Sequence, residues 1–127
     1  MAFAFGERSI KNLAGVNADL VRVAHKALAL SQIDFAVIEG LRTKARQAEL
    51  MAAGASKTMN SRHITGHAID VAPIIGGKIR WDWPLFDELA KAFKLAAKDE
   101  NVPIVWGGDW VSFKDGPHFE LDRRKYP

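Results

Sequence analysis

The chain has 127 residues, of which 48% are hydrophobic and 26% are charged, and it has no cysteine. These values are typical of an ordinary globular domain, and they exclude a disulfide scaffold, a thiol nucleophile and a thiolate metal site. The net charge of +3 suits an anionic polymer such as nucleic acid, but charge of this size is equally typical of a solvated protein surface.

The predicted elements alternate between helix and strand. Helical segments have apolar residues three and four positions apart, with capping residues such as Thr43 at their starts, whereas strands are short apolar runs or alternating patterns. In chain order we expect a helix over 17–31, a strand over 34–40, a helix over 43–54, a polar loop over 55–66, a strand over 66–73, a helix over 84–100, a strand over 103–108, a turn over 109–116 and a strand over 117–121.

Proline and glycine mark the limits of several elements. Pro73 is expected to end its strand or to place it near an edge of the sheet. The pair Gly76-Gly77 indicates a hairpin, and Pro84 stands where the first turn of a helix tolerates proline. Without repeats or linkers, the pattern predicts one compact α+β domain over 1–127, with helices packed on a small, mostly antiparallel sheet.

The stretch SRHITGHAID, residues 61–70, holds two of the four histidines of the chain. On the expected strand, Ala68 and Asp70 point to one face, while His67 points to the other, so we expect His67 to be structural or to line a binding site. Gly66 and Ala68 are small, and we expect them to leave room for a metal beside the Asp70 carboxylate.

The segment KDGPHFEL near the C-terminus supplies possible partners for SRHITGHAID. His118 and Glu120 face one side of the last expected strand, so Glu120 can hold the imidazole of His118 in place. His63, Asp70 and His118 together offer two imidazoles and one carboxylate, which is the kind of donor set that catalytic zinc takes while keeping a fourth position for water. The fourth histidine, His25, lies off the apolar stripe of its helix and receives no role.

These two blocks resemble the signatures Ser-x-His-x-x-Gly-x-Ala-x-Asp and Asp/Glu-x-x-His of the zinc peptidases of the D-alanyl-D-alanine carboxypeptidase and VanX/VanY group. The positions that match are Ser61, His63, Gly66, Ala68, Asp70, Asp115 and His118. The order of helices and strands also fits this group over almost the whole chain.

The resemblance implies a role for each matching residue. His63, Asp70 and His118 correspond to the ligands of Zn²⁺, and Asp115 corresponds to the general base that deprotonates water. Arg42 is similar to the arginine that the group directs at the substrate carbonyl. Ser61 stands at the signature serine and is expected to support the site or to touch substrate. The segment DGP containing Asp115 is also strong turn chemistry, and both readings of it can hold together.

The short, cysteine-free chain looks like the phage endolysin branch of this group, whose members cut the L-alanyl-D-glutamate bond of peptidoglycan stem peptides. That likeness implies a single peptidase domain with no separate cell-wall-binding domain. It also implies a monomer that is made in the host cytoplasm without a signal peptide, is released with the help of a holin, and acts on peptidoglycan in the periplasm. Neither stable membrane association nor nucleic-acid binding is expected, because no basic stripe or apolar span is present.

Three alternatives remain open at this point. The same chemistry would serve a D-alanyl-D-alanine carboxypeptidase or dipeptidase. A non-catalytic zinc-binding module would keep the ligands but would have little need of an acid at position 115. A nucleic-acid binder is suggested by the pI alone. The tryptophans Trp81, Trp106 and Trp110 could line a substrate groove or pack in the core.

Overall fold

The computed structural model describes residues 3–56, 61–112 and 114–127. The elements of these segments, in chain order, are α1 (Glu7–Leu13), α2 (Ala18–Leu30), β1 (Asp34–Glu39), α3 (Lys44–Ala52), β2 (Ala68–Ile75), β3 (Lys78–Ile79), α4 (Trp83–Glu100), β4 (Ile104–Trp106), the 3₁₀ turn η1 (Gly107–Asp109) and β5 (His118–Leu121). No helix of this described part is long and apolar enough to cross a membrane.

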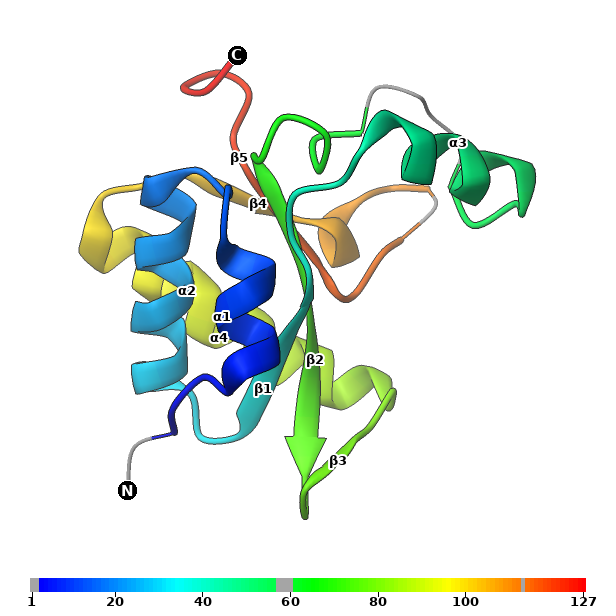
Figure 1. The fold of residues 1–127 in the computed structure, drawn as a ribbon. Coiled ribbons are helices and arrows are strands. Elements are labelled where there is room, and N and C mark those ends of the chain that lie inside the picture. The colour runs from blue at the N-terminus through cyan, green and yellow to red at the C-terminus, as the bar shows by residue number, and fades with distance from the viewer. Residues whose placement is uncertain (1–2, 57–60, 113) are drawn as a thin grey trace.

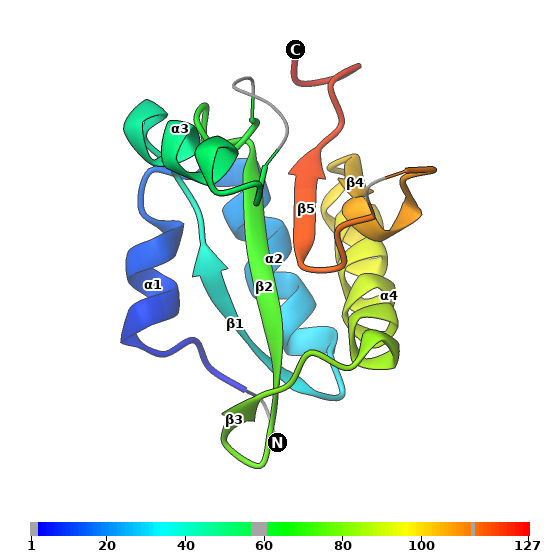
Figure 2. The same ribbon diagram turned by 90° about the vertical axis from the view of Figure 1, so that its right-hand side faces the viewer.

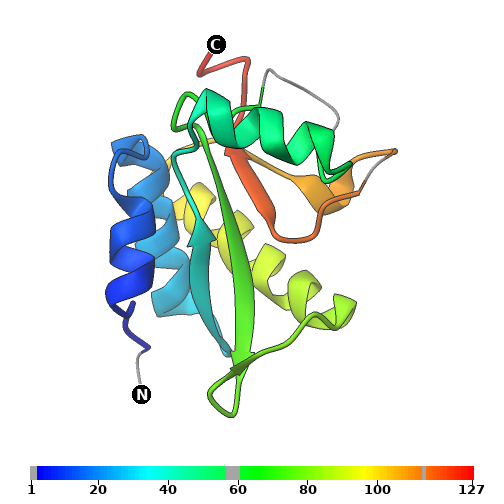
Figure 3. The ribbon, with the colours of Figure 1, turned by 45° about the vertical axis from the view of Figure 1, so that its right-hand side comes forward.

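The strands form one antiparallel sheet in the order β1-β2-β5-β4, and β3 pairs with the far end of β2. Helices α2 and α4 cover one face of this sheet, α1 lies along the outer edge of β1, and α3 and the η1 turn lie on the other side of the sheet (Figures 1 and 2). Figure 3 shows α3 and η1 flanking β2 and β5, the two central strands. The predicted class, a compact α+β domain with a mostly antiparallel sheet, is confirmed.

The core lies between the sheet and the two helices α2 and α4. The apolar stripes that the sequence predicts on these helices are buried, and so are the inward residues of β5, Phe119 and Leu121. The rings of Phe93 and Phe119 stack with centroids 4.0 Å apart, and Phe35 packs on Phe93 at 5.3 Å. Because alternate residues of a strand face opposite sides, this burial turns His118 and Glu120 to the outer face of the sheet.

Two features of the fold differ from expectation. The first is α1, which the sequence analysis did not predict because seven residues with no side-chain cap give little periodic signal. This helix covers the edge strand β1: Ser9 Oγ accepts from the backbone N–H of Val37 at 3.0 Å, and Asn12 donates to the Val37 carbonyl at 2.8 Å. The helix therefore occupies a strand edge that would otherwise be open to pairing.

The second difference concerns Pro73, which does not end β2 but stands where β2 is unpaired on one side. The strand continues to Ile75, and Pro73 pairs opposite Phe35 of β1. On the side of β2 that faces away from β1, β5 pairs only with residues 68–70 of β2 and β3 pairs only with residues 74–75. The Pro73 carbonyl accepts from Arg80 N at 3.0 Å, so the proline nitrogen points into the gap between β3 and β5, where no ladder hydrogen bond is lost. The predicted hairpin is confirmed, with φ of 60° at Gly76 and 80° at Gly77.

Candidate metal centre and active site

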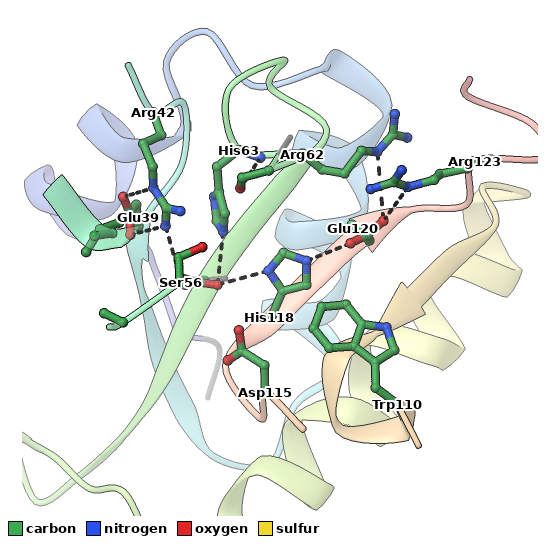
Figure 4. Close-up of a pocket in the computed structure, with 14 residues that line it drawn as sticks. Glu39, Arg42, Ser56, Arg62, His63, Trp110, Asp115, His118, Glu120 and Arg123 are labelled. Atoms are coloured by element: carbon green, nitrogen blue, oxygen red, sulfur yellow. Dashed lines mark hydrogen bonds and ion pairs between the residues drawn. The ribbon is translucent and has the colours of Figure 1, made fainter. Parts of the chain in front are cut away.

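Three side chains from separate parts of the chain converge on the outer face of the sheet. Asp70 lies on β2 directly opposite His118 on β5, and His63 enters from the turn that precedes β2. Each of the three offers one ligand atom, and these atoms all lie within 4.8 Å of one another. Figure 4 shows His63 and His118 directed toward the same point between the strands.

Hydrogen bonds orient both imidazoles. Nδ1 of His63 lies 3.0 Å from the Gly40 carbonyl, which can only accept, so Nδ1 carries a proton and Nε2 is the nitrogen directed at Asp70. Nε2 of His118 lies 2.8 Å from Glu120 Oε1, so Nδ1 is the nitrogen directed at Asp70. Nε2 of His63 is 3.2 Å and Nδ1 of His118 is 3.3 Å from Asp70 Oδ1. The donor set and its outer partners therefore fit a divalent metal such as zinc.

The electrostatics of the three groups are strongly coupled. Burial alone would raise the pKa of Asp70, but hydrogen bonds from His118 and His63 outweigh it and hold that pKa far below its usual range. Burial would lower the pKa of His118, but hydrogen bonds to Asp70 and Glu120 outweigh it and raise the pKa to about 9. An anionic carboxylate facing two imidazoles is an arrangement that a bound cation would stabilise.

Asp115 lies beside His63, Asp70 and His118, at the start of the turn that leads into β5. Its backbone N–H donates to the Gly107 carbonyl at 3.0 Å, and its carbonyl accepts from His118 N at 3.2 Å. Trp106 Nε1 donates to the Gly116 carbonyl at 2.7 Å and fixes the next residue. Burial raises the pKa of Asp115, and the negative charge of Asp70 raises it further. A carboxyl group with a raised pKa is a better proton acceptor than an ordinary aspartate.

Arg42 reaches the same centre but is held by its neighbours. Its guanidinium makes two hydrogen bonds to Glu39, at 2.6 and 2.7 Å, and a third to Gln47 Oε1 at 2.6 Å. Nη2 also lies 3.9 Å from Asp70 Oδ2. The side chain is therefore held in place, with one edge toward the Asp70 carboxylate.

One pocket of about 400 Å³ is lined by all six residues to which the sequence analysis assigned a ligand, catalytic or substrate-binding role. Its lining residues, several of them labelled in Figure 4, are Glu39, Arg42, Leu50, Ala55, Ser56, Ser61, Arg62, His63, Asp70, Trp110, Asp115, His118, Glu120 and Arg123. A concave site with convergent polar groups and perturbed pKa values is typical of an active site.

Comparisons with known proteins identify the family. The family model for the phage L-alanyl-D-glutamate peptidase matches residues 1–125. The chain belongs to this peptidase family. The L-alanyl-D-glutamate peptidase of Escherichia phage T5 is 43% identical, over 99% of this chain and 94% of its own length. The L-alanyl-D-glutamate peptidase of Listeria phage A118 is 33% identical, over 99% of this chain and 45% of its own length. The solved structure of the L-Ala D-Glu endopeptidase ChiX from Serratia marcescens superimposes with a TM-score of 0.92 at 46% identity, over 98% of this chain and 94% of that one.

The contacts of Glu120, Ser61 and His67 show how far each residue does what the sequence analysis expected of it. The expected contact between Glu120 and His118 is confirmed. Ser61 lines the pocket, and its Oγ accepts from the backbone N–H of His63 at 3.2 Å, so it supports the turn that carries His63. His67 does not line the pocket; its Nδ1 lies 2.6 Å from Thr65 Oγ1.

Gly66 does not do what the sequence analysis expected. Instead of leaving space beside Asp70, it lies in the turn before β2 with φ of 77°, and an added Cβ would come within 2.8 Å of the Gly15 carbonyl oxygen. Its own carbonyl accepts from Asn17 N at 2.8 Å. The residue is therefore glycine because the turn packs against the backbone that precedes α2.

Of the tryptophans Trp81, Trp106 and Trp110, one lines the pocket, one packs in the core and one does neither. Trp110 lines the pocket, with its ring centroid 5.0 Å from that of His118, whereas Trp106 is buried in the core. Trp81 is 61% exposed and stacks on Phe86 outside the pocket.

Sequence reasoning missed the polar groups that hold the site residues in place. The Gly40 carbonyl orients His63, Glu39 and Gln47 hold Arg42, and Arg62 and Arg123 lie beside Glu120. Spacing offered one usable signal, because Glu39 and Arg42 stand three residues apart at the end of a strand. A carbonyl that orients a histidine 23 positions away gives no such signal.

Proposed function

We propose that this protein is a zinc-dependent peptidoglycan endopeptidase that hydrolyses the L-alanyl-D-glutamate bond of stem peptides. The observation that carries the proposal is the convergence of His63, Asp70 and His118, with both outer imidazole nitrogens already hydrogen-bonded. Membership in a family named for this bond, and relatives that carry the same name, support the choice of substrate. The curated Bacillus subtilis relative CwlK, 33% identical over 83% of this chain and 69% of its own length, is named a peptidoglycan L-alanyl-D-glutamate endopeptidase.

In the proposed mechanism His63 Nε2, His118 Nδ1 and an Asp70 oxygen would hold Zn²⁺. When bound there, the metal supplies Lewis acidity that activates water near neutral pH and polarises the scissile carbonyl. Gly40 and Glu120 keep the two imidazoles in the tautomers that can bind metal. The assignment of zinc rests on the nitrogen and oxygen donor set together with the family resemblance.

Asp115 is proposed as the general base. Its raised pKa suits a group that takes the proton of the attacking water and later returns it to the leaving amine of D-glutamate. Arg42, held by Glu39 and Gln47, is proposed to direct its remaining N–H toward the substrate carbonyl, where negative charge develops. Ser61 contributes by fixing the turn of His63.

Mass spectrometry of digested stem peptides tests this function. The natively purified protein should release L-alanine from a peptide that begins L-alanyl-D-glutamate, and chelation followed by zinc addition should abolish and then restore the cleavage. Asp70→Asn should lose both zinc and activity, whereas His25→Gln, which changes an exposed histidine outside the pocket, should keep both. Release of D-alanine, or cleavage by a protein that contains no zinc, would refute the proposal.

We also propose that the protein acts as a monomer on peptidoglycan in the periplasm, after synthesis in the host cytoplasm and release through a membrane opened by a holin. The family resemblance supports this route. Expression in a Gram-negative host should lyse cells only when a holin is co-expressed, and light scattering of the purified protein should give the mass of one chain.

A further inference from the structure

The substrate of the proposed reaction brings a negative charge next to the bond that is cut. A glutamate residue has two carboxyl groups, and only one of them continues the peptide. In the γ-linked stem peptide the free group is the α-carboxylate, which is attached to the carbon that bears the leaving nitrogen and so lies about 3 Å from it. A site that cuts this bond must accommodate that carboxylate beside Asp70, Asp115 and Glu120, which are acidic themselves.

Three arginines line the pocket in the part of the chain that the structure describes, and two of them are already engaged. Arg42 is 8% exposed and bonded to Glu39 and Gln47. Arg62 is 9% exposed, and its Nη2 donates to the carbonyls of Leu121 and Tyr126 at 3.2 and 2.6 Å. The Nε of Arg62 is buried, so substrate cannot reach it.

Arg123 differs from both of these arginines. Its side chain is 65% exposed, and its ion pair with Glu120 is long, with Nε 3.7 Å from Oε2. The other oxygen of Glu120, Oε1, lies 2.8 Å from His118 Nε2. The Glu120 carboxylate therefore lies between the guanidinium of Arg123 and the imidazole of His118, a proposed metal ligand. In Figure 4 Arg123 extends from the segment after β5 over Glu120, on the pocket side of the strand.

We propose that Arg123 forms a carboxylate subsite that binds the free α-carboxylate of the D-glutamate residue. The guanidinium has unused N–H donors arranged in a fork that fits a carboxylate, and its exposure allows the side chain to turn toward the ligand. This inference rests on the proposed function and adds to it a determinant of substrate choice. Arg123 selects stem peptides with a free α-carboxylate over those in which this group is amidated.

The test compares two stem peptides that differ only in the α-group of D-glutamate, carboxylate in one and amide in the other. Wild-type protein should cleave the carboxylate form with a kcat/KM about tenfold higher, mainly through a lower KM, since a charge-assisted hydrogen bond at an exposed side chain gives an effect of this order. Arg123→Gln should cleave both forms at about the rate at which wild type cleaves the amide. Arg123→Lys should keep part of the preference.

The neighbouring Arg124 provides a matched control. It is 90% exposed, pairs with Asp122 at 2.7 Å and does not line the pocket, so Arg124→Gln should keep the full preference. If Arg123 acted only by positioning Glu120 and His118, Arg123→Gln would slow both substrates equally and the ratio would stay at its wild-type value. That result, or an Arg123→Gln variant identical to wild type, would overturn the assignment while the cleavage itself still supported the proposed function. If wild-type protein cut neither peptide at the L-alanyl-D-glutamate bond, that result would refute the proposed function instead.

Discussion

Replacing Glu120 with glutamine tests how far the metal centre depends on the residue behind His118. The Glu120 carboxylate is buried and accepts from His118 Nε2 at 2.8 Å, while its second oxygen faces Arg62 at 3.8 Å and Arg123 at 3.7 Å. A glutamine has the same shape but cannot satisfy both sides. If its oxygen faces His118, its NH₂ group meets two guanidinium groups. If it turns around, the NH₂ group favours the tautomer of His118 that protonates Nδ1, the proposed ligand atom.

The size of this effect follows from the loss of one buried, charge-assisted hydrogen bond, about 1.5–3 kcal/mol. Replacing a residue that orients a metal-binding histidine typically weakens metal affinity by about 10- to 100-fold, or about 1.4–2.7 kcal/mol. The two magnitudes agree, so we expect Glu120→Gln to bind zinc roughly 10- to 100-fold more weakly than wild type.

Competition against a chromophoric chelator measures this affinity directly. Glu88→Gln is the control, because Glu88 is a half-exposed carboxylate on α4 that pairs only with an exposed lysine, Lys91. Circular dichroism should show that both variants are folded. A zinc affinity of Glu120→Gln within about twofold of wild type would refute the reasoning, since the carboxylate would then be dispensable for orienting His118.

Three further predictions concern the base, a pH effect and the core. Asp115→Asn should lower kcat by about 10²- to 10⁴-fold while zinc content stays stoichiometric, and an equal loss of zinc would contradict its role as base. The pKa of His67 is lowered, mainly by burial, so its stabilising contribution is present above the unfolded pKa and is lost as the pH falls through the folded pKa. Denaturant titrations from pH 8 to pH 5 should therefore show wild type losing stability relative to His67→Gln, and parallel curves would exclude this. Phe93→Ala, which removes a fully buried ring between Phe35 and Phe119, should lower the free energy of unfolding by about 3–5 kcal/mol, whereas a loss below about 1 kcal/mol would mean that the core refills the space.

Local sequence patterns predicted most of the fold because most of its elements carry strong local signals. The stripe of α4 and the cap at Thr43 appear where they were expected. The exceptions have physical causes. The helix α1 is short and is stabilised by contacts with β1, and Pro73 is tolerated within β2 because no strand pairs at its nitrogen. Neither cause can be read from the residues nearby in the sequence.

The sequence by itself determined the chemistry that is available: two imidazoles and an aspartate in two recognisable blocks, an acid three positions before His118, and strand alternation that puts His118 and Glu120 on one face. Only the tertiary structure decided the geometry. The register of β2 against β5 sets Asp70 opposite His118, and the turn after β1 brings the Gly40 carbonyl to His63. Such contacts join residues far apart in the chain, so their distances depend on how the core packs the sheet.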